Sequence, residues 1–173
     1  MRRVALFLAL GIVLGSLESA LLAALGVRAF GAGLLLGLIL YLGVRAGPVE
    51  GAFASAGIGY LWDVFAGTPS GLSVGIGVVV FLFVRYATQA VDAVPAVVVV
   101  VAGLAETVRF AVLALVFWAS SSLEAATTSV ILLGHGVEIA LATALAPLVY
   151  SLAGFLDRLV VGAPTEGGEV WLS

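Results

Sequence analysis

The stretch GAFASAGIGYLWDVFAGTPSG, residues 51–71, repeats a small or acidic residue at every fourth position. Residues four apart lie on one face of an α-helix. Small side chains on such a face let another helix backbone approach closely, which is how helices associate inside a membrane. We therefore expect this face to pack against a helix, either of the same chain or of a partner. The row consists of Gly51, Ser55, Gly59, Asp63 and Gly67.

The composition of the whole chain agrees with a membrane environment. Of the 173 residues, 63% are hydrophobic and 10% are charged, and the mean hydropathy is +1.28. Soluble domains are about 25% charged, so too few polar residues remain to cover a water-facing surface. The chain has no cysteine, which excludes a disulfide framework and thiolate chemistry. The basic residues are all arginine and form no dense patch, which argues against nucleic-acid binding.

Hydrophobic stretches of spanning length recur along the chain. A spanning helix needs about 20 mostly apolar residues, and we expect an all-α bundle of six transmembrane helices in one domain, residues 1–157. The second helix is short, which suggests a tilted or partly interfacial helix. The first is long enough to be retained rather than cleaved as a signal peptide. The predicted helices cover about residues 4–26, 29–44, 49–66, 70–87, 94–118 and 123–156.

The arginines predict the orientation of this bundle. With six spans, five arginines lie on one side of the membrane and Arg28 lies on the other. Arginine is enriched in cytoplasmic segments, so we expect both termini and the tail, residues 158–173, in the cytoplasm. The five arginines on the cytoplasmic side are Arg2, Arg3, Arg45, Arg85 and Arg158.

Asp63 lies one turn before the connection between the third and fourth helices. Its carboxylate can meet backbone N–H groups at the start of the fourth helix, near Ser70 and Gly71, which lack intrahelical partners and carry partial positive charge. We interpret Asp63 as the residue that holds the two helices of this hairpin together. The alternative is a site for a ligand, an ion or a proton.

Further polar residues fall inside the predicted helices. Glu106 and Arg109 are three apart and can pair, and His135 and Glu138 have the same spacing. With Glu18 they are expected to form an internal polar network between the first, fifth and sixth helices. A proton or cation pathway, or contact with a partner's helix, are the alternatives. The chain has one histidine and no cysteine, which are too few of the ligands that zinc prefers, and it has no complete catalytic set. We therefore predict no metal, no cofactor and no enzyme activity.

The segment GIGYLWDVFAGTPSGL, residues 57–72, resembles the MreD family, the rod shape-determining membrane proteins of bacteria. The matching motif positions are Asp63, Gly67, Pro69 and Gly71. Upstream, residues 34–45 followed by Gly47-Pro48 look like the family's second helix and its basic turn. The resemblance covers roughly residues 1–157, and residues 34–85 carry its specific signal.

The resemblance implies a function. Such proteins are non-enzymatic scaffolds of the cell-elongation machinery in the bacterial inner membrane. They bind MreC, and through it they connect to MreB and the peptidoglycan synthases. Their fold is similar to the six-helix substrate-binding subunits of energy-coupling-factor transporters. That similarity leaves open a small-solute-binding transporter subunit, and the buried charges leave open a proton-coupled carrier that uses Glu106, Arg109 and Glu138.

Overall fold

The computed structural model describes residues 2–24, 33–66, 71–88, 95–119 and 128–161, which form six helices and no strand. The predicted all-α class is therefore confirmed for this part of the chain. The helices are α1 (Arg2–Ala24), α2 (Leu34–Arg45), α3 (Pro48–Ala66), α4 (Leu72–Thr88), α5 (Pro95–Ala119) and α6 (Thr128–Val161).

Two of the predicted helix boundaries need correction. The second helix begins at Leu34 and not at residue 29, because Gly33 has a left-handed backbone (φ 75°) that interrupts a right-handed helix. Residues 29–32 lie outside the described part of the chain. The last helix continues to Val161, so the first residues of the predicted tail belong to α6. Residues 162–173 of that tail are not described.

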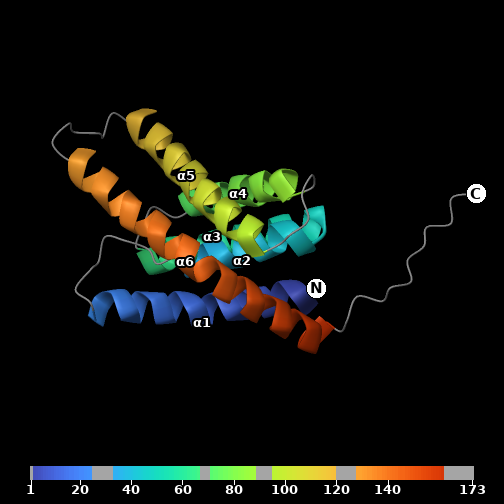
Figure 1. The fold of residues 1–173 in the computed structure, drawn as a ribbon. Coiled ribbons are helices and arrows are strands. Elements are labelled where there is room, and N and C mark those ends of the chain that lie inside the picture. Colours follow the sequence, from blue (N-terminus) through green and yellow to red (C-terminus); the bar gives the residue numbers. More distant parts are fainter. Residues whose placement is uncertain (1, 25–32, 67–70, 89–94, 120–127, 162–173) are drawn as a thin grey trace, which may run out of the picture.

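Five helices surround α2. The short α2 contacts each of the other five, and those five contact one another in the order α1, α3, α4, α5, α6 and back to α1. Figure 1 shows α2 behind α6 and between the other helices. The second helix is thus the central helix of the bundle, a place that its short length, which suggested a tilted or partly interfacial helix, did not predict.

The sequence of α2 explains its central place. Leucine, isoleucine and tyrosine point in every direction around it, and residues 34–43 are all buried. A helix that is apolar all round belongs in an apolar interior. Two glycines let its neighbours approach: a Cβ on Gly37 would lie 2.8 Å from Val149 of α6, and one on Gly43 would lie 2.6 Å from Val84 of α4.

The outer faces of the five surrounding helices are also apolar. Each exposes large hydrophobic side chains, and the examples from α1, α3, α4, α5 and α6 are Leu17, Phe53, Leu82, Leu104 and Leu148. By length and composition, two segments within the described ranges are able to cross a membrane, Arg2–Leu21 and Ile139–Val160. A small helical bundle in water would instead place polar residues on its outer faces.

Candidate functional site

The α3–α4 hairpin is held by Asp63. Its carboxylate accepts hydrogen bonds from the backbone N–H groups of Gly71 (2.7 Å) and Ser73 (3.1 Å), and the residue is 3% exposed. These donors belong to the start of α4, where N–H groups lack intrahelical partners and the helix dipole favours a negative charge. The contact expected of Asp63 is therefore present. The other expected motif positions, Gly67 and Pro69, lie outside the described residues.

Gly71 gives this hairpin its backbone shape. Its φ of 102° lies in the left-handed region that glycine adopts at little cost, and a Cβ on Gly71 would meet no atom within 4 Å. The conformation, and not the lack of space, therefore explains glycine at this position.

The row of small residues packs α3 against α4. Gly51, Ser55 and Gly59 are buried. A Cβ on Gly51 would overlap the ring of Phe81, and one on Gly77 of α4 would lie 2.7 Å from the carbonyl oxygen of Ser55. The row was expected to pack against a helix of the same chain or of a partner. It packs against α4 of the same chain, and α4 covers the surface that a partner's helix would need.

Asp63→Ala is expected to lower the free energy of unfolding by about 2 kcal/mol, because hydrogen bonds to a charged group contribute about 1.5–3 kcal/mol. Asp63→Asn keeps one acceptor oxygen and should lose less. Thermal unfolding of the purified protein in detergent measures both. Ser16→Ala, at an exposed position on α1, is the control. An Asp63→Ala variant as stable as this control would contradict the assigned role.

Glu18 has a similar position in the preceding hairpin. It is buried, and its Oε2 accepts a hydrogen bond from the backbone N–H of Leu34 (3.2 Å), the first residue of α2. An acid of α1 thus contacts the start of α2, as Asp63 of α3 contacts the start of α4. This contact is to α2, which was not among the helices assigned to the polar network, and the network between the first, fifth and sixth helices stays a prediction.

The pair formed by Glu106 and Arg109 joins α5 to α3. Nε (2.7 Å) and Nη2 of Arg109 both donate to Oε1 of Glu106, and the guanidinium lies 4.9 Å from the centre of the Trp62 ring. Glu106 is 1% exposed, and its Oε2 has no hydrogen-bond partner among the described residues. The backbones of His135 and Glu138 belong to α6, but their side chains lie outside the described part of the chain.

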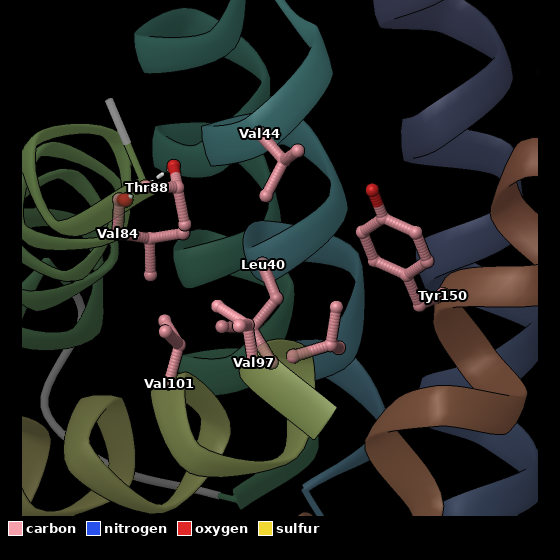
Figure 2. Close-up of a pocket in the computed structure, with 8 residues that line it drawn as sticks. Leu40, Val44, Val84, Thr88, Val97, Val101 and Tyr150 are labelled. Carbon is pink, nitrogen blue, oxygen red and sulfur yellow. Dashed lines mark hydrogen bonds between the residues drawn. The ribbon is translucent and has the colours of Figure 1, made fainter. Parts of the chain in front are cut away.

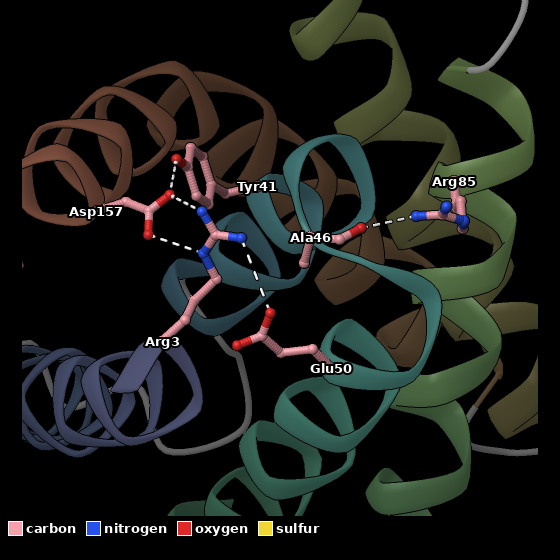
Figure 3. A network of polar contacts seen from close by, with 6 residues as sticks. All are labelled: Arg3, Tyr41, Ala46, Glu50, Arg85 and Asp157. Atoms are coloured by element: carbon pink, nitrogen blue, oxygen red, sulfur yellow. Dashed lines mark hydrogen bonds and ion pairs between the residues drawn. The ribbon is translucent and has the colours of Figure 1, made fainter. Parts of the chain in front are cut away.

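A second polar cluster joins four helix ends and was not expected from the sequence (Figure 3). Nε and Nη2 of Arg3 donate to the two carboxylate oxygens of Asp157, both at 2.9 Å. The Tyr41 hydroxyl donates to the same carboxylate (2.8 Å), and Glu50 lies 3.9 Å from Arg3. The arginine asymmetry placed Arg3 and the end of α6 on one side of the membrane. That asymmetry did not indicate which of these groups would pair with one another.

A small cavity lies between α2, α4, α5 and α6 (Figure 2). Its volume is about 10 Å³, and the lining includes Leu40, Val84, Val101 and Tyr150, one from each helix. About 10–15 Å³ is the room that one water needs, whereas pockets for small molecules occupy about 300–1,000 Å³. This cavity is therefore a packing defect and not a solute site. Within the described ranges, no three His, Cys, Asp or Glu side chains gather as metal ligands would.

Comparison of the chain with protein-family models, curated proteins and solved structures gave no match.

Proposed function

We propose that the chain is a multi-pass protein of the bacterial inner membrane, with six membrane-spanning helices and both termini in the cytoplasm. Two observations support this placement. The outer faces of the five helices around α2 are apolar, as lipid contact requires. The end of the bundle that carries the start of α1 and the ends of α2, α4 and α6 also carries five of the seven arginines, as a cytoplasmic end does.

Within that membrane we propose a non-enzymatic scaffold of the rod complex that binds MreC, and through it helps to organise MreB and the peptidoglycan synthases. The α3–α4 hairpin is the observation that carries this proposal. It contains the residues that resemble the MreD family, and both described motif positions act in it: Asp63 holds the start of α4, and Gly71 supplies the left-handed turn. These two motif positions thus shape the hairpin.

The partner's transmembrane helix then needs a surface other than the small-residue row, because α4 covers that row. The outer faces of the five surrounding helices are the surfaces that remain. Each has at least one exposed position suited to a photocrosslinking amino acid: Val13, Phe53, Val79, Leu104 and Leu148.

Co-expression of the tagged chain with a candidate MreC tests the proposal. We expect the two proteins to co-purify from membranes, and we expect crosslinks to MreC from the exposed positions of one helix or of two adjacent helices. A photocrosslinker at the buried Ile39 is the control and should give none. Absence of association would contradict the scaffold. A co-purifying small molecule in its place would favour the solute-binding subunit.

A further inference from the structure

A short sequence occurs twice in the α3–α4 hairpin. SAGIG, residues 55–59, lies in α3, and SVGIG, residues 73–77, lies in α4. The two copies pack against each other reciprocally. A Cβ on Gly59 would overlap the carbonyl oxygen of Ser73, and one on Gly77 would lie 2.7 Å from the carbonyl oxygen of the serine in the first copy. The last glycine of each copy thus belongs to the contact between α3 and α4.

The middle glycine of the first copy has a different neighbour. A Cβ on Gly57 would lie 2.5 Å from Leu8 of α1. Four residues further along α3, Leu61 packs beside Gly11 of α1, where a Cβ would lie 3.0 Å from the leucine side chain. The contacts advance in the same direction along both helices, so α1 runs parallel to α3. The face of α3 that begins at Gly57 is therefore covered by a parallel helix of the same chain.

The corresponding face of α4 is uncovered. Gly75, the middle glycine of the second copy, is exposed, and a Cβ there would meet no atom of the described residues within 4 Å. Val79 corresponds to Leu61 of α3 and is 43% exposed. The same face continues with Leu82 and Tyr86, which are also exposed. Glycine costs about 1 kcal/mol relative to alanine inside a helix, and nothing within the described chain requires it at position 75.

We propose that this face of α4 binds α4 of a second copy of the chain, and that the protein is a two-fold symmetric dimer in the membrane. The face consists of Gly75, Val79, Leu82 and Tyr86. A two-fold axis along the membrane normal brings the same helix of each copy together, and the two helices then run in the same direction, as α1 and α3 do. The exposed glycine lets the two backbones approach closely. This inference rests on the membrane placement proposed above, because two copies share one orientation only when both are inserted alike.

Cysteine crosslinking of the purified chain in liposomes tests the dimer. The chain has no cysteine of its own, so each introduced cysteine is unique. Val79→Cys should form a disulfide-linked dimer on oxidation, because equivalent residues near a two-fold axis face each other. Leu148→Cys, at an exposed position of α6, is the control and should stay monomeric. The proposal is overturned if Val79→Cys gives no more dimer than Leu148→Cys.

Gly75→Leu tests the close approach of the two helices. The leucine points away from the described residues of its own chain, so the helices should be retained, as circular dichroism can verify. It should weaken the dimer by roughly tenfold or more, the usual effect of overpacking a close contact. Alanine is small enough to keep such a contact, which is why leucine is chosen.

Energy transfer between labelled copies in liposomes measures this loss. Ala144→Leu enlarges a side chain at an exposed position of α6 and is the matched control. Equal dimer affinities for Gly75→Leu and Ala144→Leu would overturn the α4 contact.

The outcomes separate the dimer from the proposed placement and function. Extraction of the chain from cell membranes by alkaline carbonate would overturn the placement. A chain that resists extraction but is monomeric in liposomes would overturn the dimer alone. Crosslinks from position 79 to co-expressed MreC, in place of a second copy, would assign this face to that partner and overturn the dimer. An intact dimer that does not associate with MreC would overturn the scaffold and leave the dimer standing.

Discussion

Gly59→Ala is expected to separate α3 from α4 and to lower the free energy of unfolding by about 3 kcal/mol, the upper part of the range for overpacking. A Cβ on Gly59 would meet the carbonyl oxygen of Ser73, and it would lie 2.7 Å from the carbonyl carbon of Ser73 and 2.9 Å from the Cα of Val74. These are backbone atoms of α4, so no side-chain rotation relieves the contact. The helices must move apart, which also weakens the hydrogen bonds of Asp63.

Gly75→Ala is the matched control for this experiment. Gly75 lies in α4 and is exposed, and a Cβ there would meet no atom within 4 Å. Alanine is favoured over glycine in a helix by about 1 kcal/mol, so this variant should be as stable as the wild type or more so. Thermal unfolding in detergent compares the two variants. Equal melting temperatures would show that the α3–α4 contact is looser than described.

Arg109→Leu is expected to destabilise the protein by about 3–5 kcal/mol, the cost of removing one partner from a buried ion pair. The substitution leaves Glu106 buried without the two hydrogen bonds from Arg109, and it removes the guanidinium from the Trp62 ring. Glu106→Gln should cost less, because the glutamine side chain has no charge and its carbonyl oxygen still accepts a hydrogen bond from Arg109.

The order of these two losses is the result to measure. Unfolding in detergent of Arg109→Leu, Glu106→Gln and the double variant gives the coupling between the residues. Arg158→Leu removes the same charge at an exposed position of α6 and should change stability little. Equal losses for Arg109→Leu and Glu106→Gln would contradict the account of a buried acid that depends on this arginine.

Several elements could be predicted from the sequence because their signals are local. Apolar stretches separated by arginine, glycine and proline predicted six helices, and the structure has six in its described part. The spacing of Glu106 and Arg109 predicted their pairing, because residues three apart share a helix face. The position of Asp63, just before a helix start, predicted its contact with the N–H groups of α4.

The arrangement of the helices could not be predicted in this way. The short length of α2 suggested a tilted or partly interfacial helix and did not predict that five neighbours bury it, because burial depends on contacts with distant parts of the chain. Arg3 and Asp157 are 154 residues apart in sequence, and no periodicity links them. The small-residue row predicted a close helix contact, but its partner in α4 became known only from the packing.

The enclosure of α2 has a consequence for biosynthesis. Its contacts with α6 include Gly33 against Ala142 and Gly37 against Val149, and these partners follow α2 by roughly 100 residues. At about 5–20 residues per second of synthesis, α2 waits roughly 5–20 s for them. During this interval one side of α2 has no helix of its own chain beside it. In the membrane placement proposed above, lipid or an insertase covers that side until α6 is made and completes the environment of α2.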